Sequence, residues 1–222
     1  HKKKDIALSL KLPIMKPSLI ALFTLFAFIA SSAKAFVIDA EGEPVINGGT
    51  YYILPFINVL GGGLTLAKTG NETCPLSVKP YPSLPIHLEH GLPWKIASPL
   101  RIRYLPTNVW VDFFTVDETI PSCVPFPSSW TIVEEEDGVK SVKVSGHGYE
   151  NPITGVFRIK KYTQIGYTYK IVFCPTHSDS CKDIGLSSRG LVLTDYVPLG
   201  VIFVKVESSE VSKQVINNVL EA

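Results

Sequence analysis

The segment Ser98–Pro106 reads SPLRIRYLP, and its two arginines are the residues of this chain best suited to chemistry with another protein. Proteases of the trypsin class cleave after arginine, because an acidic pocket pairs with the guanidinium group. A proline near each end restricts the backbone of the segment. Two interpretations are open at this point: a protease-directed loop, or an amphipathic strand with both arginines in water and Ile102 and Tyr104 facing a core.

No other group of residues in the sequence matches a catalytic signature. It contains no G-x-S-x-G, no H-E-x-x-H and no phosphate-binding loop. His87 and His90 fall in a proline-rich stretch expected to be a loop, and His147 lies between two glycines in an expected turn. The acidic run 134–137 precedes Gly138, which predicts a solvated hairpin turn. We therefore expect no enzyme, no cofactor and no metal.

Positions 1–35 are predicted to lie outside the folded domain. Met15, the only methionine, opens a segment with one lysine, an apolar run at 19–30 and the ending Ala33-Lys34-Ala35. This pattern is typical of a secretory signal peptide (15–35) cleaved before Phe36, and the apolar run is short for a membrane span. Positions 1–14 are interpreted as an upstream or artefactual extension. The expected folded domain is 36–206, followed by a tail at 207–222.

The chain after the leader is mildly acidic. The whole sequence has 21 Lys and Arg against 20 Asp and Glu, but six of the basic residues and only one acidic residue lie in 1–35. The rest of the chain therefore holds 15 basic and 19 acidic side chains, a net charge of −4. Its length fits one domain with a substantial core. A mildly acidic surface without a basic cluster argues against nucleic acid as a partner.

Four cysteines in a secreted chain predict two disulfides, for which three connectivities exist. Cys174 and Cys181 are close in sequence and are expected to form a hairpin staple. That leaves Cys74 and Cys123, which would close a long loop containing SPLRIRYLP. A metal site at Cys174, His177 and Cys181 is disfavoured, because the spacing fits no standard zinc site.

Short runs of Val, Ile, Tyr, Phe and Thr, separated by Gly, Pro, Asn and Asp, predict an all-β protein without helices. TYYIL, RIRYL and FRIKKY start at positions 50, 101 and 157, and LSVK, WTIVE and LVLT start at 76, 130 and 191, so both sets recur at similar intervals. Three units of four strands are the layout of a β-trefoil. The twelve expected strands are 50–54, 64–67, 76–79, 94–97, 101–105, 109–113, 130–134, 139–144, 157–162, 167–173, 191–194 and 201–206.

Several stretches together resemble the plant Kunitz-type trypsin inhibitor family. They are FVIDAEGEPVINGGTYYILP, GNETCPLSV, SPLRIRYLP, WTIVE and YKIVFCP followed by CKDIGLS. The opening pattern D-x-x-G-x-P-[VL]-x-N-G-G-x-Y-Y runs from Asp39 to Tyr52, and the four cysteines follow in the family's order and spacing. The resemblance extends from Phe36 to about Val206, nearly the whole of the expected domain.

The resemblance implies a β-trefoil of twelve strands with pseudo-threefold symmetry and two disulfides. It implies inhibition of trypsin-like serine endopeptidases, in the secretory pathway and then outside the cell or in the vacuole, as in seed and plant-defence proteins. Carried onto this chain, the reactive bond is Arg101–Ile102, and Asn47 supports the loop. The remaining residues expected to contact the protease are Ser98, Pro99, Leu100, Arg103 and Tyr104.

Members of this family differ in their targets, so an alternative function stays open. The same scaffold serves inhibitors of other protease classes or of amylase, and non-inhibitory binding or storage proteins. Arg101, Ile102 and Asn47 favour trypsin-like proteases as partners. We expect a monomer without membrane contact after signal cleavage. Asn71, in Asn71-Glu72-Thr73, is the expected N-glycosylation site.

Overall fold

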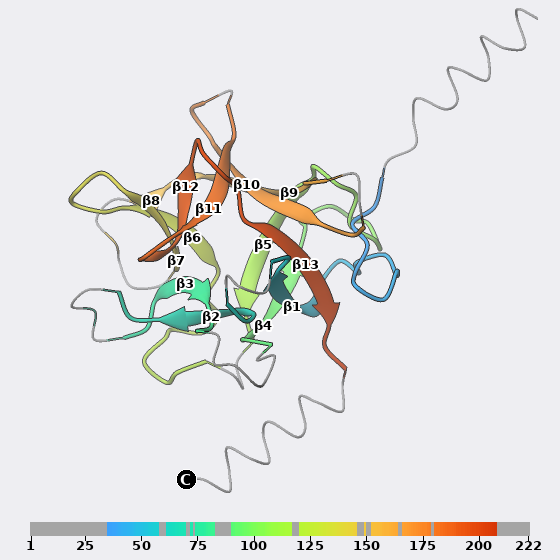
Figure 1. The fold of residues 1–222 in the computed structure, drawn as a ribbon, viewed down its shortest axis with the longest axis horizontal. Coiled ribbons are helices and arrows are strands. Elements are labelled where there is room, and N and C mark those ends of the chain that lie inside the picture. Colours follow the sequence, from blue (N-terminus) through green and yellow to red (C-terminus); the bar gives the residue numbers. More distant parts are fainter. Residues whose placement is uncertain are drawn as a thin grey trace, which may run out of the picture. The chain divides into compact units, whose positions relative to one another are not determined.

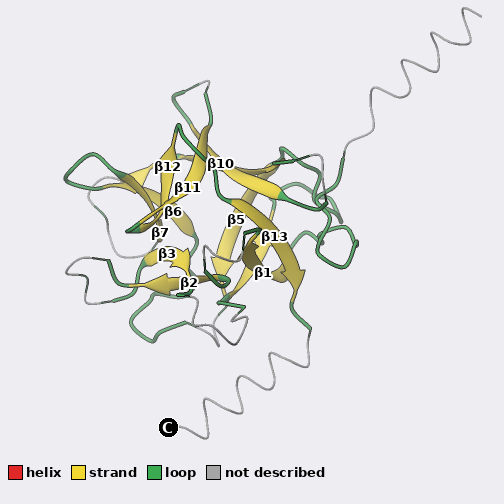
Figure 2. Ribbon diagram, in the orientation of Figure 1, coloured by secondary structure: helices red, strands yellow, loops and turns green. Residues whose placement is uncertain are grey.

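The structure, a computed structural model, describes residues 35–207 apart from 58–60, 70–71, 73, 83–89, 117–119, 146–148, 150–151, 164–165 and 179. Positions 1–34 and 208–222 lie outside the described residues, and they hold the expected extension and almost all of the expected signal peptide and tail. The described residues form strands and loops only (Figure 2). Among them, accordingly, no helix has the length and apolar character needed to cross a membrane.

Thirteen strands form one antiparallel sheet in the described part of the chain. They occur where the sequence concentrates β-branched and aromatic residues, which suit a pleated, half-buried surface. In β4, for example, Trp94 and Ile96 are buried and Lys95 between them is exposed, the alternation expected of a strand. The strands are β1 (Gly49–Pro55), β2 (Leu64–Ala67), β3 (Ser77–Pro80), β4 (Pro93–Ala97), β5 (Trp110–Thr115), β6 (Trp130–Glu134), β7 (Lys140–Val144), β8 (Pro152–Ile153), β9 (Gly155–Lys161), β10 (Tyr169–Pro175), β11 (Lys182–Ser187), β12 (Gly190–Thr194) and β13 (Gly200–Lys205).

Eleven of the twelve expected strands are present, each within two residues of its expected ends. The expected strand at 101–105 is wrong: this segment is a loop in which only Tyr104 pairs, through an isolated bridge to Ile46. The expected set also lacks β8 and β11. Asp183 and Gly185 give β11 a weak strand pattern, but hydrogen-bonded neighbours on both sides, β10 and β12, outweigh the local preference.

Six strands close into a barrel. Their hydrogen-bonded order is β13–β1–β4–β5–β9–β10. The last strand, β10, pairs with the first, β13, where Tyr169 lies opposite Val201, and this pairing closes the barrel. The other strands form the hairpins β2–β3, β6–β7 and β11–β12, with β8 added beside β6. Figure 1 shows the barrel strands toward the right and the hairpins toward the left. This is the β-trefoil arrangement, and β8 raises the number of described strands to thirteen.

The three repeats of the trefoil are β1–β4, β5–β9 and β10–β13. Their first strands begin at Gly49, Trp110 and Tyr169, so the spacing of the repeats agrees with the sequence. The alignment of the repeats expected from the sequence is partly wrong. RIRYL does not open the second repeat, and WTIVE is the second strand of its repeat whereas LSVK and LVLT correspond to third strands.

Aromatic side chains from all three repeats meet in the core. Trp130 stacks on Phe113 with ring centroids 4.3 Å apart, and its edge meets Trp94 at 5.4 Å. Phe157 continues the cluster to Phe173, with centroids 5.1 Å apart. Each such pair contributes about 0.5–1.5 kcal/mol beyond the area that it buries. The repeats are therefore joined by side-chain packing as well as by the closed sheet.

Two disulfides join Cys74 to Cys123 and Cys174 to Cys181, with Cα atoms 6.0 and 4.0 Å apart, so none of the four cysteines of the sequence is free. The first connects the chain ahead of β3 to the chain ahead of β6, across the first two repeats. The second ties the end of β10 to the start of β11. Both therefore restrain loops that the hairpins alone do not hold.

A buried ion-pair network lies near the first disulfide. The Lys143 ammonium on β7 lies 2.6 Å from a Glu72 carboxylate oxygen and 2.9 Å from one of Glu135. Burial lowers the pKa of Lys143, but the hydrogen bonds to the two carboxylates outweigh it and leave the pKa above its ordinary value. The lysine stays charged and attaches the chain before Cys74 to the second repeat.

Candidate protease-binding loop

The segment Ser98–Pro106 connects β4 to β5 and stands out from the barrel. Arg101 and Arg103 are exposed, whereas Ile102 is half-buried and packs against the core. Exposed and covered side chains therefore alternate as they would in a strand. The segment nevertheless forms no continuous ladder with another strand, because its one pairing is the isolated bridge of Tyr104 to Ile46. Leu100 is 49% exposed, an unusual state for a leucine held in a defined loop.

Asn47 connects the two sides of the Arg101–Ile102 bond. Its side-chain amide nitrogen lies 3.1 Å from the Leu100 carbonyl oxygen, 3.1 Å from that of Ile102 and 3.2 Å from that of Ser98. An amide has two hydrogens, so the three acceptors share them. In the opposite direction, the Asn47 side-chain oxygen accepts the Ser98 N–H at 2.7 Å. One side chain thus holds the loop on both sides of the bond.

Backbone hydrogen bonds fix the second half of the loop between two segments of the chain that precedes β1. The Asn47 N–H donates to the Arg103 carbonyl at 2.9 Å. Leu105, which is fully buried, donates to the Val45 carbonyl at 2.9 Å and accepts the Val37 N–H at 2.8 Å. The loop after the bond is therefore anchored on both edges, and its conformation does not depend on Asn47 alone.

Three buried polar side chains position that preceding segment, and the sequence reasoning did not identify them as loop supports. A carboxylate oxygen of Asp39 accepts the N–H groups of Glu41 and Glu43 at 3.0 and 2.9 Å. The hydroxyls of Tyr51 and Tyr169 accept the N–H groups of residues 46 and 38 at 2.9 and 2.8 Å. Asp39 and Tyr51 belong to the opening sequence pattern, so that pattern could have identified two of the three loop supports.

The tyrosine hydroxyls stay neutral. Burial, assisted by the nearby charge of Asp39, raises the pKa of Tyr51 and of Tyr169, although the backbone hydrogen bond that each accepts acts in the opposite direction. A neutral phenol accepts one backbone N–H and keeps its own hydrogen for another partner. The support of the loop segment is therefore unchanged over the physiological pH range.

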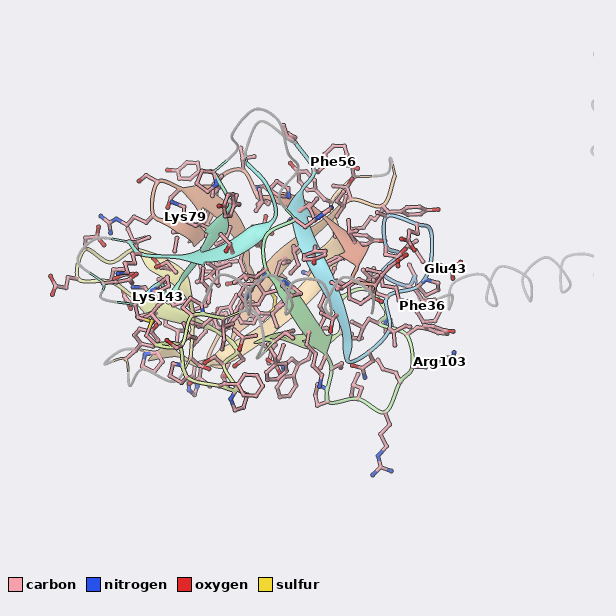
Figure 3. All side chains as sticks on the ribbon, turned by 90° about the horizontal axis from the view of Figure 1, so that it is seen from below. Phe36, Glu43, Phe56, Lys79, Arg103 and Lys143 are labelled. Atoms are coloured by element: carbon pink, nitrogen blue, oxygen red, sulfur yellow. A yellow bond between two sulfur atoms is a disulfide. The ribbon has the colours of Figure 1, made fainter. Side chains whose placement is uncertain are left out.

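The exposed surface of the loop is basic and aromatic. The guanidinium carbon of Arg103 lies 5.1 Å from the ring centroid of Tyr104, and Phe36 meets the same ring edge-on at 6.1 Å. Figure 3 shows Phe36, Glu43 and Arg103 together on the right, away from Lys79 and Lys143 on the left. Arg101 forms no ion pair with any residue that the structure describes, so its charge is available to a partner.

The histidines and cysteines considered in the sequence analysis do not form a catalytic or metal site within the described ranges. His90 stacks on the ring of Tyr52 with centroids 5.0 Å apart, and His87 and His147 lie outside the described residues. Among the described residues, no group of three His, Cys, Asp or Glu side chains could hold a metal. Cys174 and Cys181 are bonded to each other, which removes them as thiolate ligands.

The acidic run at 134–137 lies at the turn between β6 and β7, as expected, but two of its members form ion pairs. Glu135 binds Lys143, and a carboxylate oxygen of Asp137 lies 2.6 Å from Arg189 in the β11–β12 turn. The acidic run thus connects hairpins and is not solvated throughout.

The expected glycosylation residue Asn71 lies outside the described residues.

The geometry defines a class of protein: a closed β-trefoil that presents one exposed loop, held in a fixed conformation by a hydrogen-bonded network behind it. Residues 37–205 match the Kunitz_legume family, described as "Trypsin and protease inhibitor", and the chain belongs to this family. The description names inhibitors of proteases and not enzymes.

Relatives and solved structures agree with this placement. The chain is 36% identical to "Trypsin inhibitor A" of Glycine max over 217 residues, 90% of this chain and 96% of that protein. It is 42% identical to "Trypsin inhibitor 1B" of Psophocarpus tetragonolobus over 178 residues, 78% of this chain and 99% of that protein. The soybean inhibitor in a complex of porcine pancreatic trypsin with soybean trypsin inhibitor is similar in structure, with a TM-score of 0.69, 36% identity and coverage of 78% of this chain and 99% of the other.

Proposed function

We propose that this protein inhibits trypsin-like serine proteases by presenting Arg101–Ile102 as a substrate-like bond. The observation that carries the proposal is the position of Asn47, which is hydrogen-bonded to carbonyl oxygens on both sides of that bond. The relatives named trypsin inhibitors, and the complex of one of them with trypsin, support the same target class.

In this proposal Arg101 enters the specificity pocket of the protease. Its exposed guanidinium has no ion-pair partner among the described residues, so it can pair with a pocket carboxylate without first breaking a bond. The loop already has its bound shape and loses little conformational entropy on docking. Such interfaces bury about 1,600 Å² in total and reach high affinity.

The hydrogen bonds of Asn47 also explain why a loop with a cleavable bond would inhibit the protease and not simply be digested. When the protease serine attacks the Arg101 carbonyl carbon, the peptide bond breaks, the acyl group passes to the serine and Ile102 takes the proton as a new amine. Asn47 holds the carbonyls of Leu100 and Ile102, so this amine stays beside the acyl group. It can attack the acyl carbon and restore the bond faster than water removes it.

The neighbouring loop residues complete the proposed contact surface. The backbone of Ser98 is hydrogen-bonded to the Asn47 side chain, and the exposed residues Pro99 and Leu100 precede Arg101. Arg103 and Tyr104 follow it and pack against each other. We assign them to binding and Arg101 to specificity, because only the side chain before the cleaved bond enters the deep pocket.

We further propose that the protein matures in the secretory pathway and acts outside the cell or in the vacuole as a monomer. The two disulfides support this, because disulfides persist in oxidising compartments. The leader pattern at 15–35 supports it from the sequence.

The experiment is a titration of trypsin activity with the oxidised protein. We expect a near-stoichiometric loss of activity, and in Arg101→Ala a weakening of binding by several kcal/mol, as for a buried interface anchor. Arg189→Ala is the matched control, because Arg189 is an exposed arginine in the β11–β12 turn and should leave inhibition unchanged. If Arg101→Ala inhibits as well as the parent, the assigned bond is wrong. If the parent does not inhibit at micromolar concentration, the alternatives take its place: an inhibitor of another protease class or of amylase, or a non-inhibitory binding or storage protein.

A further inference from the structure

A cavity of about 870 Å³ opens among the hairpins, far from the loop that carries Arg101. Its lining comes from the start of β7, from β8, β11 and β12, and from the loop between Cys174 and Cys181. The volume falls within the range of about 300–1,000 Å³ that is usual for small-molecule sites. The proposed inhibitory function uses none of its lining residues.

Two restrained segments contribute to the walls of this cavity. One wall is the ring closed by the Cys174–Cys181 disulfide, which contributes His177 and Ser178 to the lining. Another is the β11–β12 hairpin, whose ladder runs without interruption from the Asp183–Thr194 pair to the turn. Residues restrained by a disulfide or a hairpin ladder lose less conformational entropy when a ligand binds than residues of a free loop do.

The floor of the cavity is apolar and its rim carries an exposed aromatic ring. Val139, Ile153 and Leu193 are half-buried in the lining, and Leu186 is 38% exposed. The side chain of Tyr196 at the rim is 90% exposed, the highest value among the large apolar residues described. An aromatic side chain left in water beside an apolar hollow is well placed to cover a flat, apolar ligand.

Charge at the rim favours an anion. Lys140 and Lys182 both line the cavity, and Asp195 is its one acidic lining residue. Asp195 lies 2.5 Å from the Lys182 ammonium and neutralises it, whereas Lys140 has no ion pair with a described residue. Glu134 lies opposite Lys140 in the β6–β7 ladder but does not line the cavity. Lys140 is therefore the lining lysine that forms no ion pair with a described residue, beside the apolar floor.

Hydroxyl groups add hydrogen-bond donors at the same rim. Ser178, Ser180 and Thr194 line the cavity. The Ser178 and Ser180 hydroxyls share a hydrogen bond at 3.1 Å, which uses one of their two hydrogens, and the Thr194 hydroxyl accepts the Tyr196 N–H and keeps its own hydrogen for an anionic oxygen. An apolar floor, an aromatic rim, the Lys140 ammonium and several hydroxyls match a flat apolar body that carries an anionic group.

The cavity and the inhibitory loop lie on different sides of the trefoil. Figure 1 shows β7, β8, β11 and β12 toward the left and the blue segment after residue 35, which braces the loop, at the right. In the perpendicular view of Figure 3, Lys143 of β7 and Arg103 of the loop are again at opposite sides. A ligand in the cavity therefore leaves the loop accessible.

We propose that this cavity is a second binding site, which takes a small aromatic anion such as an aromatic carboxylate or sulfonate. The aromatic body lies on Val139, Ile153 and Leu193 under the Tyr196 ring, and the anionic group meets the Lys140 ammonium. Protease and ligand bind at the same time.

The test uses 8-anilinonaphthalene-1-sulfonate, a fluorescent aromatic sulfonate, and the oxidised full-length protein. We expect saturable binding, with one site and a dissociation constant on the order of tens of micromolar. Tyr196→Ala should weaken it about tenfold, and Lys140→Gln about fivefold, with a loss of salt dependence. Both residues are on the surface, and circular dichroism verifies that each variant is folded.

Two variants outside the cavity are the matched controls. Phe126→Ala removes an exposed aromatic ring and Lys205→Gln an exposed lysine, and neither residue lines the cavity. Both should bind the probe as the parent does, and a saturating probe should leave the trypsin titration of the parent unchanged. The proposal is overturned by an absence of saturable binding up to about 1 mM, by cavity variants that bind normally, or by competition between the probe and trypsin.

Discussion

The hydroxyl of Tyr169 accepts the backbone N–H of Ile38 at 2.8 Å, across 131 residues of sequence. Tyr169 lies on β10, at the point where the barrel closes against β13, and Ile38 lies in the segment that flanks the loop Ser98–Pro106. The closure of the barrel and the position of the loop are therefore coupled through one buried hydroxyl.

Replacing this tyrosine by phenylalanine tests the coupling. Tyr169→Phe keeps the ring in the core but leaves the Ile38 N–H without its acceptor, so we expect unfolding to require about 1–3 kcal/mol less. Urea denaturation measures the loss, and Tyr196→Phe is the control, because that side chain is 90% exposed. Equal stability of the two variants would contradict the assigned role of Tyr169.

Asn47 is expected to decide whether the loop inhibits or is digested. Asn47→Ala removes the hydrogen bonds to the loop carbonyls, so we expect an unchanged fold and a weakening of trypsin inhibition by about 1–3 kcal/mol, that is, by roughly five- to 150-fold. Mass spectrometry over a long incubation with trypsin should show faster cleavage after Arg101.

A second substitution at the same position separates the two functions of the amide. Asn47→Asp keeps the oxygen that accepts the Ser98 N–H but has no hydrogens for the carbonyls of Leu100 and Ile102. It should therefore be cleaved at least as fast as the alanine variant. A parent-like cleavage rate in Asn47→Asp would show that the donor hydrogens are not needed.

The two disulfides are expected to differ in their contribution to stability. By loop-entropy arguments, the Cys74–Cys123 bond, with a sequence separation of 49, stabilises the fold by about 4 kcal/mol, and the Cys174–Cys181 bond, with a separation of 7, by about 2.5 kcal/mol. Urea denaturation of the two double Cys→Ser variants measures the difference. A greater loss from the shorter loop would show that packing around Cys174 matters more than chain entropy.

Alkaline pH is expected to destabilise the protein through its buried tyrosines. Burial raises the pKa of Tyr51 and Tyr169 in the folded state, so the folded chain holds these phenol protons more tightly than the unfolded chain does. Their contribution to stability is complete below the unfolded pKa of about 10 and is lost as pH rises through the higher folded pKa. Denaturation midpoints should be constant well below pH 10 and fall as pH rises above about 10, less steeply in Tyr169→Phe. An equal slope in that variant would exclude Tyr169 as a source.

Local patterns in the sequence were sufficient for most of the strands, whereas the reactive-loop hypothesis needed the resemblance to a family over the whole domain. Runs such as WTIVE and LTLA match their strands residue for residue. In WTIVE, aromatic and β-branched residues face the core, and in LTLA the two leucines do so in alternation with a half-buried threonine. The same pattern misled at RIRYL: Ile102 and Tyr104 are covered and the arginines exposed, yet the segment lacks ladder partners. Period-two alternation reports which side chains are covered and does not report hydrogen bonding.

The sequence by itself determined the all-β class, the spacing of the repeats, the positions of the cysteines and the arginine that we propose a protease recognises. Only the tertiary structure decided that β10 closes the barrel against β13, that Asn47 reaches both sides of the Arg101–Ile102 bond, and that Tyr169 supports Ile38. It also decided that Lys140 and Tyr196 meet at one cavity. Composition and spacing act between near neighbours in the chain, whereas these contacts join positions that are distant in sequence. They form only when the closed sheet brings them together.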